Sequence, residues 1–103
     1  MVYELKVAKE AERDLYDIFD YINSSLEAFQ AASDFFAKVQ SCFRQLVDNP
    51  YVYALSSDLR LEEEGYRKAV IGNYLLMFTV DEKEKCVFVH RLFYGAMDYS
   101  RFL

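Results

Sequence analysis

Three apolar runs separated by two turns constrain the fold of this chain more than any other feature of its sequence. The dipeptide Gly72-Asn73 lies between the first two runs, and two-residue spacers of this kind close tight β-hairpins. A polar link at residues 81–85 separates the second run from the third. We therefore predict a three-stranded antiparallel meander, with strands at residues 66–71, 74–80 and 86–93.

The second and third predicted strands are apolar on both faces. Side chains alternate across a strand, so Leu76 and Phe78 point to one face while Leu75 and Met77 point to the other. A strand of this kind is either covered on both faces or bound by a partner. The rest of the chain is too short to cover both faces, so we predict that one face stays open.

The N-terminal half predicts one strand and two helices. Residues 2–7 alternate between apolar and polar, as in a half-buried strand at or beside a sheet edge. Residues 8–22 and 29–46 instead repeat apolar side chains every three or four positions, as amphipathic helices do. Pro50 ends the second helix. The stripes expected to pack are Ala8, Ala11, Leu15, Ile18 and Ile22, and Phe29, Ala32, Phe36, Val39, Phe43 and Leu46.

These elements predict a single α+β domain over residues 1–103, in the order β-α-α-β-β-β. The two helices are joined by a few residues and should therefore form an antiparallel hairpin over one face of the sheet. Residues 51–64 have weak periodicity and predict an irregular loop that can include a short helical turn. Residues 97–103 are too few for an independent helix and predict a final turn or a segment docked on the sheet.

Composition narrows the possible functions. The chain has a formal net charge of −5 and a pI of about 4.8, which disfavours tight nucleic-acid binding without sequence preference. No apolar run approaches the length of a membrane span, and the first residues do not resemble a signal peptide. Cys42 and Cys86 lack metal-ligand spacing and predict buried thiols in a reducing compartment. The chain has nine Phe and nine Tyr, a surplus that is typical of contact surfaces.

The order and spacing of several motifs resemble the RelE/ParE superfamily of toxins from bacterial type II toxin–antitoxin systems, sometimes labelled plasmid-stabilisation proteins. The likeness is closest to the ParE-like branch and covers nearly the whole chain. The opening YELKVAKEAERDLYDIFDYI resembles the first strand and helix of the family, and LVDNP resembles the end of its second helix. The most specific stretch is GYRKAVIGNYLLMFTVDEKEKCVFVHRLFYGAMDY.

The resemblance implies a small cytoplasmic toxin with a helical hairpin over a curved sheet. It also implies a partly disordered antitoxin that folds across the toxin in a hetero-oligomer. Exposed apolar surface suits such a partner, because a segment that orders on binding must offset its ordering entropy. Neither the residues nor the resemblance implies a cofactor or a metal.

Two kinds of target remain open within the superfamily. RelE-like members cleave mRNA in the ribosome, whereas ParE-like members inhibit DNA gyrase by protein contact. RNA cleavage needs proton transfer and cations around the phosphate, and each missing cation should cost on the order of 10²-fold in rate. Leu75 stands where ribonuclease relatives often carry Arg, and residues 94–99 read Tyr-Gly-Ala-Met-Asp-Tyr in place of His-Gly-Arg-Arg-Asp-Tyr.

The missing cations favour the gyrase inhibitor over the ribonuclease. A weakened toxin that only binds its antitoxin is a further alternative, because Tyr94, Ala96 and Met97 depart from the family pattern. If the chain is a ribonuclease, the resemblance points to Arg67, His90, Arg91 and Tyr99 as catalytic residues. The candidate contacts for an antitoxin or target are Arg67, Leu75, Met77, Arg91, Tyr94, Met97 and Tyr99.

Overall fold

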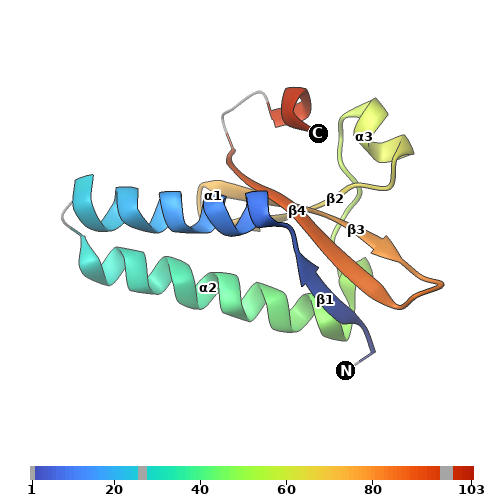
Figure 1. The fold of residues 1–103 in the computed structure, drawn as a ribbon. Coiled ribbons are helices and arrows are strands. Elements are labelled where there is room, and N and C mark those ends of the chain that lie inside the picture. Colours follow the sequence, from blue (N-terminus) through green and yellow to red (C-terminus); the bar gives the residue numbers. More distant parts are fainter. Residues whose placement is uncertain (1, 26–27, 96–98) are drawn as a thin grey trace.

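The computed structural model describes residues 2–25, 28–95 and 99–103. It confirms the predicted order of one strand, two helices and three strands, and it places a short third helix in the loop before the second strand (Figure 1). The elements are β1 (Glu4–Val7), α1 (Lys9–Asp20), a π-helical turn (Tyr21–Ser25), α2 (Phe29–Asp48), a 3₁₀ turn (Pro50–Val52), α3 (Leu59–Glu63), β2 (Arg67–Ile71), β3 (Tyr74–Asp81), β4 (Cys86–Tyr94) and a final 3₁₀ turn (Tyr99–Phe102).

The sheet has four strands in the order β1-β4-β3-β2. Strands β2, β3 and β4 form the predicted antiparallel meander, and β1 joins one edge by pairing parallel to β4. Gly72 has a φ of +59° in the turn between β2 and β3, a conformation that glycine adopts without a steric penalty. The structure therefore confirms the β-hairpin that Gly72-Asn73 predicts.

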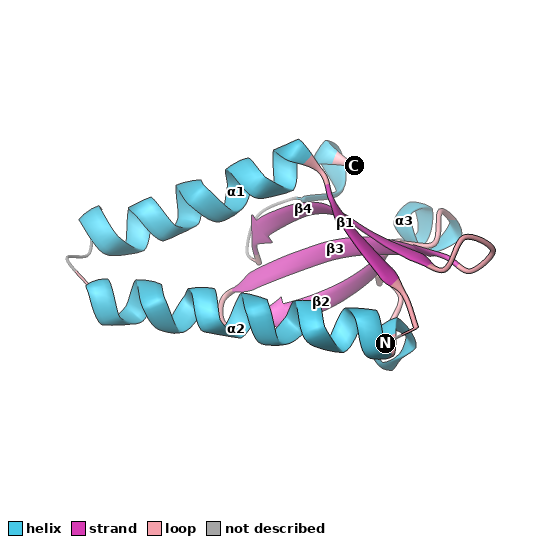
Figure 2. Cartoon of the chain, turned by 60° about the horizontal axis from the view of Figure 1, so that its bottom comes forward, coloured by secondary structure: helices cyan, strands magenta, loops and turns pink. Residues whose placement is uncertain are grey.

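Helices α1 and α2 run antiparallel against one face of the sheet and extend past its end (Figure 2). They bury the main core, which includes Ala11, Ala32, Val39, Leu46, Leu76, Phe78 and Val87. This arrangement confirms the predicted helical hairpin. Each helix presents an apolar stripe to the sheet, because packing removes that stripe from water. Burial stabilises the fold by roughly 25 cal/mol for each Å² of apolar surface removed from water.

The apolar stripe predicted for α2 is partly wrong. Phe29 and Phe36 are 67% and 46% exposed, whereas Phe35 and Cys42 are buried against the sheet. Apolar residues cover more than one side of α2, so spacing alone did not reveal which side would meet the sheet. Of these two exposed rings, Phe36 borders a groove between α1 and α2.

The second face of the sheet is also less open than predicted. Leu61 of α3 packs there with Met77 and Phe93, and these three side chains are at most 3% exposed. Tyr66, Leu75 and Leu103 surround them. Figure 1 shows α3 and the C-terminal turn together on the side of the sheet away from α2. Two short segments thus cover part of a face that we expected to stay exposed.

The structure also agrees with the predictions for the two cysteines, for the loop after α2 and for the end of the chain. Cys42 and Cys86 are buried free thiols. The loop at residues 51–64 contains a helical turn, and the chain closes with a 3₁₀ turn. Within the described residues, no helix has both the length and the apolar character needed to span a membrane.

Candidate partner-binding surfaces

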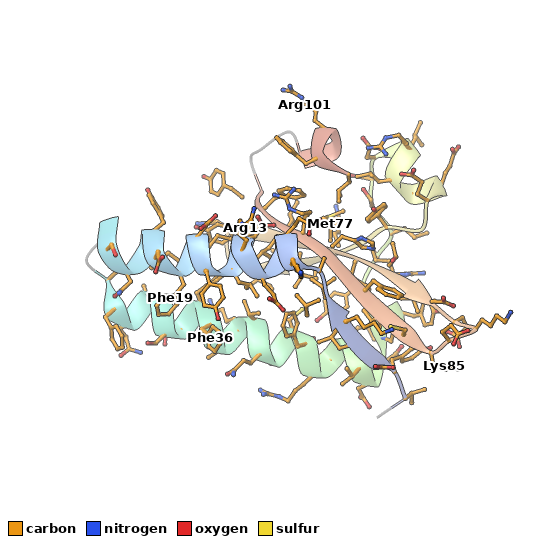
Figure 3. All side chains as sticks on the ribbon, in the orientation of Figure 1. Arg13, Phe19, Phe36, Met77, Lys85 and Arg101 are labelled. Atoms are coloured by element: carbon orange, nitrogen blue, oxygen red, sulfur yellow. The ribbon has the colours of Figure 1, made fainter. Side chains whose placement is uncertain are left out.

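An apolar groove of about 540 Å³ lies between α1 and α2. The rings of Phe19 and Phe36 meet across it edge to face, with centroids 6.4 Å apart (Figure 3). Among the described residues that line the groove, only Glu12 is charged. The lining is Val7, Glu12, Leu15, Tyr16, Phe19, Phe36 and Phe43. An apolar groove between two helices is suited to an amphipathic helix of a partner.

The helical hairpin carries two strongly exposed aromatic side chains, Tyr16 and Phe29. Tyr16 is 71% exposed beside the groove, and Phe29 is 67% exposed near the start of α2. Large apolar side chains gathered on one element are typical of a contact surface. The sequence predicted Phe29 to pack in the core and did not single out Tyr16, although the extra apolar positions of α2 were a usable signal of a contact surface.

The predicted contacts Leu75 and Met77 lie in the small apolar cluster on the other face of the sheet. Met77 is fully buried and Leu75 is partly buried. The Met77 side chain therefore cannot touch a partner unless α3 or the C-terminal turn moves. This burial corrects the expectation that both side chains stand on an open strand face.

Arg91 is held by Asp14 of α1. Its Nε and Nη2 atoms donate to the two carboxylate oxygens of Asp14 at 2.8 and 3.1 Å. The backbone N–H of Leu92 donates to the same carboxylate at 2.9 Å. The hydrogen bond to Asp14 raises the pKa of Arg91. Asp14 thus neutralises Arg91 and fastens α1 to β4 where β1 no longer pairs with that strand.

Arg67 lies on the face of the sheet that the helices cover, and it contacts the loop after α2. It pairs with Phe78 in the ladder and therefore points to the same face as that core side chain. Its Nη1 atom donates to the carbonyl oxygen of Tyr53 at 2.6 Å, and its guanidinium lies 4.9 Å from the centroid of the Tyr51 ring. Arg67 anchors the loop that follows α2.

His90 is the extra residue of a β-bulge in β4, where the register with β3 shifts between Met77 and Phe78. Its Nε2 atom shares a 2.8 Å hydrogen bond with Thr79 Oγ1, and the Tyr66 ring lies 5.0 Å away. Burial lowers the pKa of His90, which favours a neutral imidazole. In the described part of the chain, no Lys or Arg side chain hydrogen-bonds to this imidazole.

The structure therefore does not bring Arg67, His90 and Arg91 together as one catalytic group. Each has a different partner, and Arg67 lies on the opposite face from the other two. Tyr94 is 54% exposed at the end of β4, with its ring 6.0 Å from that of Tyr74. Met97 lies outside the described residues, and the Tyr99 side chain is also not described.

A polar cluster ties the turn between β3 and β4 to the residue before β1 and to the 3₁₀ turn after α2. Glu82 accepts hydrogen bonds from Lys85, from the Tyr51 hydroxyl at 2.6 Å and from the Tyr3 hydroxyl at 2.8 Å. These bonds lower the pKa of Glu82 to about 2, the one from Lys85 most strongly. The bond to Glu82 raises the pKa of Tyr51 to about 12. The cluster joins segments that are distant in sequence.

The sequence matches a known family over almost the entire chain. Residues 5–99 match the family described as the ParE toxin of the type II toxin–antitoxin system parDE. The chain belongs to this ParE toxin family. No match was found among proteins of curated function.

Solved structures agree with this membership at the level of the fold. The chromosomal ParDE toxin–antitoxin system of P. aeruginosa matches with a TM-score of 0.70 and 18% identity, over 90% of this chain and 96% of that chain. The RelBE2 complex of Mycobacterium tuberculosis matches with a TM-score of 0.59 and 20% identity, over 91% and 99%. The archaeal RelE–RelB complex of Pyrococcus horikoshii OT3 has a TM-score of 0.57 and 14% identity, over 92% and 97%.

Proposed function

We propose that this ParE family toxin acts in the cytoplasm by binding DNA gyrase and is neutralised by an antitoxin helix in the α1–α2 groove. The observation that carries the proposal is the groove itself, because its lining is almost entirely apolar or aromatic. A partner helix that fills it would bury the rings of Phe19 and Phe36. Tyr, Phe and other large side chains in such grooves supply much of the binding energy at protein interfaces.

Gyrase inhibition by protein contact is favoured over RNA cleavage by the surroundings of the candidate catalytic residues. Arg91 is paired with Asp14, and Arg67 lies on the face opposite His90. A phosphoryl-transfer site needs cations that converge on the reacting phosphate. The described residues around His90 offer a Thr hydroxyl and aromatic rings in that place.

The target is tested by adding the purified chain to DNA gyrase and following supercoiling and trapped cleavage complexes. We expect inhibition of supercoiling at stoichiometric toxin. Normal gyrase activity at saturating toxin would refute the gyrase target. Cleavage of mRNA during translation would establish the ribonuclease instead, and unimpaired growth on expression without antitoxin would indicate a weakened toxin.

The antitoxin site is tested by co-expressing the chain with the small reading frame next to its gene. Phe36→Ala should weaken the complex by more than about tenfold, because the ring lines the groove. The matched control is Leu59→Ala, which removes a large apolar side chain that is 78% exposed on α3, outside the helical hairpin. Equal effects of the two variants, with unchanged circular dichroism, would show that the groove does not bind the antitoxin.

A further inference from the structure

Strand β2 lies at the edge of the sheet opposite β1, and the first half of its outer side is already paired. The N–H of Ser56 donates to the carbonyl oxygen of Tyr66 at 2.8 Å, and the N–H of Lys68 donates to that of Ala54 at 3.1 Å. These bonds show that the backbone groups of Tyr66 and Lys68 point away from β3. The loop after α2 thus acts as a partial fifth strand.

The second half of this outer side is unpaired at Val70. Backbone groups alternate along a strand, so the N–H and C=O of Val70 point outward like those of Lys68. The pairing segment has left the edge by then, because Pro50–Val52 forms a 3₁₀ turn. In the described part of the chain, no backbone group bonds to Val70 on this side, and its side chain is 68% exposed.

A cleft of about 340 Å³ lies beside this free edge, between α2 and β2. Its lining combines polar and apolar groups, and none of the described lining residues is acidic. The lining residues are Lys38, Ser41, Cys42, Gln45, Tyr53, Val70, Ile71 and Gly72. Lys38 contributes a positive charge from α2, whereas Lys68 pairs with Met77 and therefore points to the opposite face of the sheet. In a chain with a net charge of −5, this is a place that favours an acidic ligand.

We propose that the β2 edge and this cleft bind an extended, acidic polypeptide segment as an added strand. Its backbone pairs with the N–H and C=O of Val70, and one of its carboxylates lies near the ammonium of Lys38. Main-chain hydrogen bonds give such complexes affinity, and the flanking side chains give them specificity. The inference rests on the proposed function only for the identity of the polypeptide, which would be a second segment of the antitoxin.

The edge is tested directly by NMR titration of the ¹⁵N-labelled chain with the blocked peptide Glu-Val-Glu-Val-Glu-Val. We expect the largest amide shifts at Val70 and along the cleft. The matched peptide Lys-Val-Lys-Val-Lys-Val should bind at least about threefold more weakly, and so should the acidic peptide to a Lys38→Gln chain, since exposed charge pairs contribute modest energies. Equal binding of the two peptides, or shifts confined to the α1–α2 groove, would overturn the proposal.

The backbone contact is tested by comparing Val70→Pro with Val70→Ala. Proline removes the outward N–H, which takes no part in pairing with β3, and proline is tolerated on the free side of an edge strand. The proline variant should bind the acidic peptide about fivefold more weakly than the alanine variant, as expected for one net backbone hydrogen bond. Equal affinities of the proline and alanine variants for the acidic peptide would refute the proposal that the peptide pairs with β2 as an added strand.

Circular dichroism shows whether the proline variant folds. If it does not, the exchange rate of the Val70 amide in the unaltered chain decides the question. Saturating acidic peptide should slow that exchange at least about tenfold, and an unchanged rate would overturn the proposal. A chain that binds the peptide but no antitoxin refutes the proposed neutralisation alone, whereas a chain that binds antitoxin with a freely exchanging Val70 amide refutes only the edge site.

Discussion

The contact between Asp14 and Arg91 gives the sharpest test of how the helical hairpin is fastened to the sheet. Asp14→Ala removes a carboxylate that accepts three hydrogen bonds, two from Arg91 and one from the backbone of Leu92. The side chains of Arg91 and Asp14 are 27% and 14% exposed, so water replaces these bonds incompletely. The substitution should therefore destabilise the fold more than loss of a surface ion pair would.

The magnitude follows from the burial of the pair. Exposed ion pairs contribute about 0–1 kcal/mol, whereas loss of one partner of a fully buried pair costs about 3–5 kcal/mol. Asp14 lies between these limits, and the better helix propensity of alanine returns about 0.5 kcal/mol. We expect a net loss of about 2 kcal/mol, which lowers the melting temperature of a domain of this size by roughly 8–16 °C.

The assay is urea denaturation followed by circular dichroism, with the slope of the transition checked for constancy. The control is Asp17→Ala, an exposed acidic residue of the same helix, which gains the same helix propensity and loses no described hydrogen bond. Asp14→Ala and Arg91→Ala should also be non-additive in the double variant. If Asp14→Ala costs no more than Asp17→Ala, this carboxylate does not fasten α1 to β4.

Three further predictions concern the core and two titrating side chains. Leu46→Ala removes a fully buried side chain of α2 and should cost about 2–5 kcal/mol in urea denaturation, and a cost below about 1 kcal/mol would contradict its place in the core. The folded Glu82 carboxylate has a pKa near 2, below its ordinary 4.5, so the unfolded chain binds protons first. Its stabilisation should be present above pH 4.5 and lost as pH falls toward 2, and Glu82→Gln should flatten the dependence of the urea midpoint over that range. His90 is the single histidine, and its imidazole should titrate below pH 6.5 by NMR, because burial disfavours the charged ring; a value at or above 6.5 would contradict the described burial.

Much of the fold was readable because its signals are local. Gly72 and Asn73 marked the hairpin, and the change of hydrophobic period separated β1 from α1. The Pro50 stop marked the end of α2 within two residues. The α3 turn and the final turn were only permitted by the sequence, because short helices depend on tertiary contacts for their stability.

The exposure of individual side chains was harder to predict from the sequence, because it depends on which segments pack against each other. Leu75 and Met77 have the alternation of an open strand face, yet Leu61 and Leu103 cover them from segments far away in the chain. Phe36 repeats like a core residue, yet it lines a groove because Phe35 reached the sheet instead. Arg91 is a predicted partner contact, yet its guanidinium is paired with Asp14, which lies 77 positions earlier in the chain.

The sequence alone determined the order of the elements and the hairpin turn, because backbone preference and hydrophobic period act between near neighbours. It also determined membership of a toxin superfamily, through the order and spacing of its motifs. Tertiary structure decided which apolar side chains are covered and which cations are neutralised. Those outcomes depend on contacts between residues tens of positions apart, and periodicity along the chain carries no record of such contacts.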